Sequence, residues 1–109
     1  MYNVYMSAIL TKVKETECNK ITLFQQTSPI AMHHIALVVG NLRYIQTDPR
    51  ISLIADPTMI TAAINEFAEL GSYVDATDEY MGTSISTDYT FLVMPPSFPY
   101  GAIENPMLI

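Results

Sequence analysis

The chain has 109 residues, the size of one small domain; half of them are apolar and only 15% are charged. Five basic and eleven acidic residues give a net charge of −6, which argues against a nucleic-acid partner because phosphates need a basic surface. The sequence contains no basic cluster for anionic lipids and no apolar run of membrane-spanning length, so we expect no membrane partner. Because the start of the chain lacks the features of a secretory signal, we expect a cytoplasmic location.

The first forty residues predict mainly strands. Apolar and polar residues alternate over 2–11 and again over 20–27, which is the period of a β-strand. The charged residues of 12–19 predict a polar hairpin or loop between them. The unbroken apolar run 35–39 predicts a strand buried on both faces, ended by Gly40.

The next segment predicts a turn, a strand and a helix. Residues 48–50 form a turn sequence, and 51–55 predict a short strand. Asp56 is suited to cap a helix over about 57–70, and Gly71 to end it. The apolar stripe of that helix predicts core packing and consists of Met59, Ile60, Ala63, Ile64, Phe67 and Leu70.

Residues 72–88 are polar and acidic and predict an exposed loop. The acidic run 75–79 lacks the ligand spacing and central glycine of an EF-hand, so we do not expect calcium there. The apolar residues 89–94 predict a strand that leads into the last part of the chain.

The segment from Pro95 to Pro106 reads P-P-S-F-P-Y-G-A-I-E-N-P and holds the residues of most chemical interest. A carboxylate such as Glu104 can recognise a protonated amine through a charge-assisted hydrogen bond. The small residues Gly101 and Ala102 permit close backbone approach, so that an extended peptide can pair as an added strand. Judged by spacing alone this pattern is weak, because a turn at a strand edge explains it better.

The twelve residues together resemble the P-P-S-F-P-Y-G-G-M-E-N-P signature of the zinc aminopeptidase family of leukotriene hydrolase and aminopeptidase N. Further likenesses lie upstream: 89–94 is similar to the strand that precedes this signature, and Pro29-Ile30 with 35–40 to the end of the family's amino-terminal β domain. The resemblance implies an α+β partial chain, with 1–43 as the end of that β domain and 44–109 as the start of a thermolysin-like catalytic domain.

The resemblance also implies the roles of individual residues. Glu104 would bind the α-amine of a peptide substrate with a free N-terminus, and the surrounding substrate-binding residues would be Tyr100, Gly101, Ala102, Ile103 and Asn105. Ile103 replaces the usual methionine and Ala102 the second glycine, and neither change removes a charge. Thr90 stands where many members have aspartate, which puts the local contact of that carboxylate in doubt.

The zinc motif of the family, H-E-x-x-H, does not occur in this sequence. We therefore expect zinc in the full-length family member, but no metal ligand and no catalytic residue within this chain. His33 and His34 do not substitute for the motif, because two ligands on one helix face need i, i+4 spacing and neighbours on a strand point to opposite faces. Cys18, the only cysteine, permits neither an intramolecular disulfide nor a cysteine-rich zinc site.

Two hypotheses about function follow. The first is a fragment of a zinc-dependent aminopeptidase that removes N-terminal residues from peptides, is inactive alone and needs the remainder of the catalytic domain. The alternative is a non-catalytic truncated product that binds an intact relative or has no function.

Overall fold

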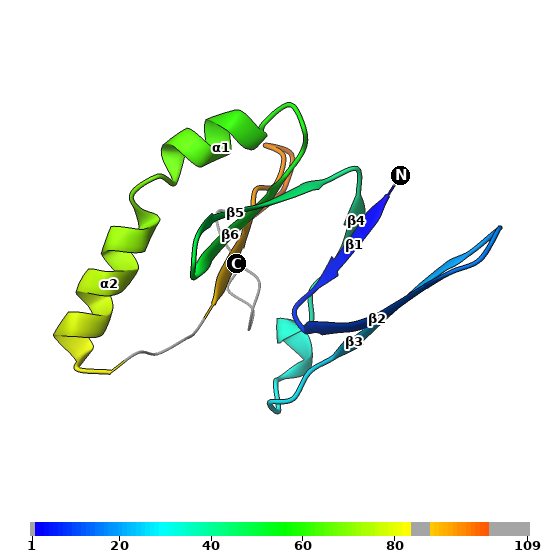
Figure 1. The fold of residues 1–109 in the computed structure, drawn as a ribbon, viewed down its shortest axis with the longest axis horizontal. Coiled ribbons are helices and arrows are strands. Elements are labelled where there is room, and N and C mark those ends of the chain that lie inside the picture. The colour runs from blue at the N-terminus through cyan, green and yellow to red at the C-terminus, as the bar shows by residue number, and fades with distance from the viewer. Residues whose placement is uncertain (1, 84–87, 101–109) are drawn as a thin grey trace.

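The computed structural model describes residues 2–83 and 88–100 of the chain and combines strands with helices (Figure 1). This mixture confirms the α+β class. The strands are β1 (Asn3–Met6), β2 (Ile9–Glu15), β3 (Lys20–Gln25), β4 (Leu37–Gly40), β5 (Arg43–Asp48), β6 (Ile51–Ala55) and β7 (Tyr89–Leu92). The helices are the 3-10 turn η1 (Met32–His34) and the α-helices α1 (Ile60–Glu66) and α2 (Leu70–Met81). None of the helices in this part of the chain has the length and apolar character needed to cross a membrane.

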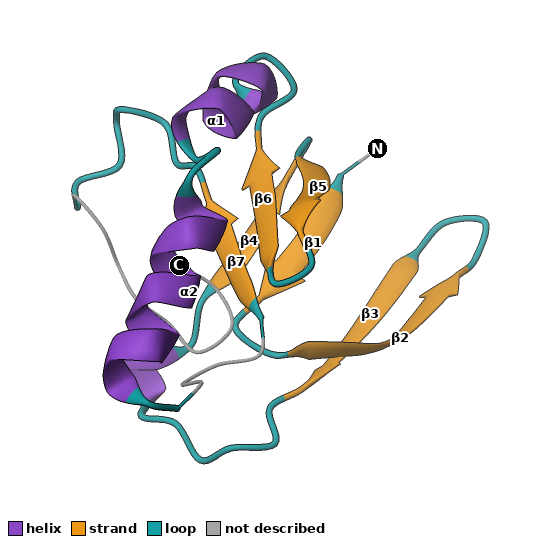
Figure 2. Ribbon diagram, turned by 60° about the vertical axis from the view of Figure 1, so that its left-hand side comes forward, coloured by secondary structure: helices purple, strands orange, loops and turns teal. Residues whose placement is uncertain are grey.

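The strands form three small sheets, which Figure 2 shows from the side. β1 pairs with β4, and β2 pairs with β3, both antiparallel. The third sheet has the order β5-β6-β7, in which β5 and β6 are antiparallel and β6 and β7 are parallel. A parallel pair needs a long crossover connection, and α1 and α2 lie within the one that joins β6 to β7.

The core of the described residues lies on β6, where all five residues are buried. Leu53 and Ala55 pack with Ile60 and Ala63 of α1. Five partly buried side chains pack against this core. They are Ile45 of β5, Ile64 of α1, Phe67 just after α1, Phe91 of β7 and Val93 just after β7. β6 is buried because it has a paired strand on each side and α1 packed against it.

Residues 35–39, by contrast, are not a strand buried on both faces, and that prediction was wrong. β4 has alternating exposure, with Leu37 62% and Val39 60% exposed. In the described part of the chain its one paired neighbour is β1, and no layer covers these two side chains. An apolar run shows that a strand can be buried. Whether it is buried depends on which other elements pack against it.

The predicted helix 57–70 is shorter at both ends, since α1 begins at Ile60 and ends at Glu66, and a second helix begins at Leu70. The Asp56 side chain accepts hydrogen bonds from the backbone N–H of Thr58 at 2.8 Å and from its hydroxyl at 2.6 Å, so it caps the turn before α1. Three turn residues separate α1 from α2. Of the predicted stripe, Ile60 and Ala63 are buried as expected, whereas Met59 is half exposed.

Residues 72–81 are helical, so the prediction of a loop over 72–88 was wrong for this part. Gly71 does not end a helix but lies at the start of α2, where an added Cβ would be 2.9 Å from Oδ2 of Asp48. Gly71 thus permits a close approach of the helix to the β5–β6 turn. The helix stops instead at Gly82, whose φ of 70° is the left-handed conformation that favours glycine.

The N-terminal residues 2–11 are two strands of different sheets, not one. The change of direction falls at Ser7 and Ala8, which are both buried. The hydroxyl of Ser7 donates to the carbonyl of His34 at 3.0 Å and accepts from the N–H of Ala36 at 2.8 Å. These bonds, and one from Gln26 Nε2 to the Ser7 carbonyl at 2.9 Å, hold β1, β3 and η1 together.

Several local predictions were confirmed. The structure has the hairpin turn within 12–19, the strand 51–55 and a strand within 89–94. The turn at 48–50 is closed by a hydrogen bond from the backbone N–H of Arg50 to Oδ1 of Asp48 at 3.1 Å.

Candidate functional site

The residues predicted to bind substrate fall almost entirely outside the described part of the chain. Gly101, Ala102, Ile103, Glu104 and Asn105 all lie outside the described residues. Tyr100 is described and is 62% exposed. Its ring meets Phe98 edge to face, with centroids 5.6 Å apart. Its role in lining a pocket stays a prediction.

The chain leaves the third sheet just before this motif. β7 pairs with β6 through Leu92, and the N–H of Val93 extends the pairing by one bond of 2.8 Å to the carbonyl of Ile54. Pro95 and Pro96 follow after Met94, and a proline has no N–H to donate to a sheet. The chain then turns, with the N–H of Phe98 bonded to the carbonyl of Pro95 at 2.9 Å. A turn at residues 95–98 therefore connects β7, which is paired in the sheet, to the rest of the predicted motif.

β7 is held firmly beneath this turn by aromatic packing. The ring of Phe91 stacks on Phe67, which follows α1, with centroids 5.9 Å apart and planes at 22°. Tyr89 also stacks with Phe91, with ring centroids 6.5 Å apart. Such pairs contribute roughly 0.5–1.5 kcal/mol beyond the burial of their area. The strand that leads to the motif is thus fixed to both β6 and the helical connection.

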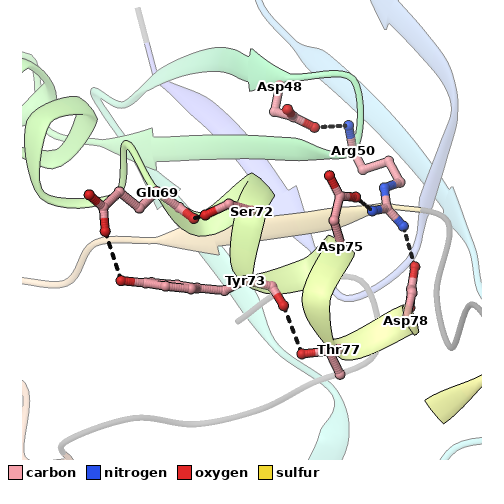
Figure 3. Close-up of polar contacts among 8 residues, drawn as sticks. All are labelled: Asp48, Arg50, Glu69, Ser72, Tyr73, Asp75, Thr77 and Asp78. Atoms are coloured by element: carbon pink, nitrogen blue, oxygen red, sulfur yellow. Dashed lines mark hydrogen bonds and ion pairs between the residues drawn. The ribbon is translucent and has the colours of Figure 1, made fainter. Parts of the chain in front are cut away.

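A cluster of charges joins the start of β6 to α2 (Figure 3). Arg50 donates from Nη1 to Oδ2 of Asp78 at 2.6 Å and from Nη2 to Asp75. The hydrogen bond to Asp78 and the two neighbouring negative charges raise the pKa of Arg50, although partial burial opposes this. At the start of the same helix, the Tyr73 hydroxyl donates a hydrogen bond of 2.8 Å to Glu69.

These contacts of Asp75 and Asp78 were missed by sequence reasoning, which placed both residues in a solvated loop. A signal was present, because residues three apart share one face of a helix. Arg50 lies 25 and 28 residues earlier, however, and only the fold brings it to that face. The cluster serves to hold the connection in place, since its acidic groups are already occupied by the guanidinium.

The described residues do not fit a zinc site. Over 2–83 and 88–100 the structure contains no group of three or more histidine, cysteine or acidic side chains able to hold a metal ion. His33 and His34 lie on η1, not on a strand as predicted, with ring centroids 4.2 Å apart. Two neighbouring imidazoles without a third ligand are not a structural or catalytic zinc centre.

Two side-chain hydrogen bonds lie near the predicted domain boundary at residue 43, one on each side of it. Nδ2 of Asn3 donates to the carbonyl of Leu42 at 2.9 Å, and the hydroxyls of Tyr44 and Ser52 are 2.7 Å apart. Burial, and to a smaller extent Tyr44, raises the pKa of Tyr5. The division into 1–43 and 44–109 stays a prediction.

Sequence comparison finds relatives of known name, although no protein-family model matches the chain. It is 37% identical over 89 residues to leukotriene A-4 hydrolase of Xenopus laevis and 40% identical over 86 residues to aminopeptidase B of Mus musculus. These alignments cover 82% and 78% of this chain. A leucine aminopeptidase 2 of Eremothecium gossypii is 32% identical over 85 residues.

Solved structures show the same fold. The native yeast LTA4 hydrolase superposes with a TM-score of 0.81 over 97% of this chain, at 24% identity. The yeast LTA4 hydrolase in complex with bestatin gives a TM-score of 0.82 at 23% identity. This chain spans 13–15% of the length of the named relatives and 16–17% of these two solved chains.

These likenesses place the chain in a peptidase class whose named members are aminopeptidases and leukotriene hydrolases. Specifically, the chain belongs to the family of leukotriene A-4 hydrolase and aminopeptidase B.

Proposed function

We propose that this chain is the segment of a cytoplasmic, zinc-dependent aminopeptidase that binds the N-terminus of the peptide substrate. The observation that carries the proposal is the uninterrupted motif from Pro95 to Pro106, in a chain that aligns with two aminopeptidases and a leukotriene hydrolase over about four fifths of its length. In this proposal Glu104 holds the protonated α-amine. Its immediate neighbours Gly101, Ala102, Ile103 and Asn105 form the wall along which the peptide lies.

Physical chemistry supports this division of roles. An aminopeptidase must distinguish the end of a peptide from its interior, and the distinguishing feature is the ammonium group. A carboxylate binds that group with a charge-assisted hydrogen bond of about 1.5–3 kcal/mol. The turn after β7 exposes Tyr100 beside the motif, which gives the first substrate side chain an aromatic surface to contact.

Binding and hydrolysis are separate in this proposal. The sequence has no H-E-x-x-H, and the described residues do not fit a zinc site, so the groups that break the peptide bond come from residues other than these 109. We therefore expect the isolated chain to be inactive and to require the rest of the catalytic domain.

The proposal is tested in a chimaera in which these 109 residues replace the homologous segment of mouse aminopeptidase B. We expect the chimaera to hydrolyse aminoacyl p-nitroanilides, and the isolated chain, assayed in parallel, to show no turnover. Glu104→Ala in the chimaera should lower kcat/KM by about 10- to 200-fold, the equivalent of one hydrogen bond to a charged group. Glu17→Ala is the matched control, because Glu17 is an exposed glutamate in the β2–β3 loop, outside the motif.

An active chimaera in which Glu104→Ala keeps full kcat/KM would show that another group binds the amine. Substrates with an acetylated N-terminus give a second check. If Glu104 recognises the ammonium group, acetylation should remove most of the difference between the original and the Glu104→Ala chimaera.

A further inference from the structure

The β2–β3 hairpin has apolar side chains on both of its faces. Opposite residues in an antiparallel pair point to the same side, so the register assigns each side chain to a face. One face, called here the lysine face, carries Ile9, Ile21 and Leu23 with Lys12 and Lys14. The other, called here the neutral face, carries Leu10, Val13 and Phe24 with Glu15 and Lys20.

Neither face is covered within the described residues. Ile9, Leu10, Val13, Ile21 and Leu23 are between 43% and 53% exposed. The hairpin extends away from the rest of the chain in both ribbon views (Figures 1 and 2). An isolated two-stranded hairpin is at best marginally stable in water, and one that is apolar on both sides needs a layer on each.

The two faces differ in charge. Three of the five basic residues of this acidic chain, Lys12, Lys14 and Lys20, belong to the hairpin. On the neutral face Lys20 forms an ion pair with Glu15 at 3.2 Å. On the lysine face neither lysine has an ion pair among the described residues. The lysine face therefore suits an apolar surface that also carries carboxylates, and it repels a second copy of itself.

The comparisons show that this fold is one part of a longer polypeptide in a relative. The fold of 97% of this chain recurs in yeast LTA4 hydrolase as only 17% of a much longer polypeptide. We propose that the hairpin is inserted between two layers of polypeptide that the family fold supplies beyond these 109 residues, with an acidic layer on the lysine face. The proposal rests on burial, register and charge and does not depend on the role of Glu104.

The test places one aspartate on each face, Leu10→Asp on the neutral face and Leu23→Asp on the lysine face. In the aminopeptidase B chimaera each change should lower Tm by about 5 °C or more, because a covered carboxylate loses its hydration. In the isolated chain the same changes should shift Tm by no more than about 1 °C, because both positions are exposed to water. Since Tm is measured without substrate, the result is independent of the proposed amine binding.

Charge-neutral lysine variants test the acidic layer. Lys12→Gln with Lys14→Gln should lower Tm of the chimaera, and the loss should diminish at high salt, which screens the attraction. Lys20→Gln is the matched control on the neutral face, where the partner of the lysine is the hairpin's own Glu15. An equal effect of the control would overturn the assignment of the acidic layer.

A second measurement applies if the chimaera fails to fold. Aspartate is introduced into full-length yeast LTA4 hydrolase at the positions that superpose on Leu10 and Leu23, and Tm should fall there too. Unchanged Tm in a folded full-length protein would overturn the proposal. So would concentration-dependent self-association of the isolated chain that Leu10→Asp or Leu23→Asp abolishes, because the occupant would then be a second copy.

Discussion

Arg50, just before β6, binds Asp78 of α2 through a hydrogen bond of 2.6 Å between Nη1 and Oδ2. The two side chains are 27% and 19% exposed, so the contact is partly shielded from water. No side chain of α2 is fully buried, although Leu70 and Val74 are partly covered. The ion pairs of Arg50 therefore add to this partial burial in holding α2 in place.

We expect Arg50→Met to loosen α2 while leaving the three-stranded sheet folded. Partly exposed ion pairs change the equilibrium for local opening of a helix only modestly. Limited proteolysis within α2 should therefore become about two- to fivefold faster. Arg43→Met is the control, because Arg43 is an exposed arginine on β5. Equal cleavage rates in the two variants would show that Arg50 does not hold the helix.

The relative burial of β6 and β4 gives a second prediction. Leu53 is completely buried in the core, whereas Leu37 is 62% exposed. Leu53→Ala should lower the free energy of unfolding by about 2–5 kcal/mol, because it leaves a cavity. Leu37→Ala should change that free energy by no more than about 0.5 kcal/mol. Both values come from urea denaturation of the isolated chain, and a larger effect at Leu37 would contradict the observed burial.

The elements that sequence reasoning predicted well are those decided by neighbouring residues. The strand at Ile51–Ala55 and the turn before it depend on an apolar run next to Asp-Pro-Arg. The hairpin turn depends on the polar residues 12–19. The family of leukotriene A-4 hydrolase and aminopeptidase B was also identified from local sequence, since the motif that suggested it is continuous along the chain.

The elements that it missed depend on distant partners. α2 has only a short apolar stripe that includes Leu70 and Val74, and its ion pairs reach back 25 and 28 residues to Arg50. β4 was expected to be buried because of its composition, but the described residues supply no layer over Leu37 and Val39. Of the predicted site, the structure describes only Tyr100, so the part played by Glu104 rests on the motif.

Ser7 connects three parts of the N-terminal half through its hydroxyl and backbone. It is 1% exposed, and its hydroxyl both donates to His34 and accepts from Ala36. Ser7→Ala leaves a carbonyl and an N–H without this partner, which should lower the free energy of unfolding by about 1–3 kcal/mol. Ser28→Ala, at an exposed serine 21 residues later in the sequence, should have little effect. Comparable losses in the two variants would mean that the Ser7 hydroxyl contributes nothing specific.

The turn before α1 gives a prediction about pH. Hydrogen bonds from the hydroxyl and then the backbone N–H of Thr58 hold the pKa of Asp56 below its ordinary value of 3.8. The folded state therefore favours the carboxylate. Its stabilising effect is fully present above pH 3.8 and is lost as the pH falls through the lower pKa of the folded state.

The charge of Asp56 is isolated by Asp56→Asn, which keeps an acceptor oxygen but cannot ionise. At pH 6 we expect the variant to melt about 2–4 °C below the original chain, because a charged acceptor binds N–H and O–H groups more strongly than a neutral one. The difference in Tm should shrink steadily as the pH is lowered below 3.8. Thr58→Val removes the hydroxyl, which is the larger cause of the pKa shift. In a chain that carries Thr58→Val, adding Asp56→Asn should therefore lower Tm by less at pH 6. A difference in Tm that stays constant down to pH 2, or that grows as the pH falls, would show that the Asp56 carboxylate does not stabilise this turn in its charged form.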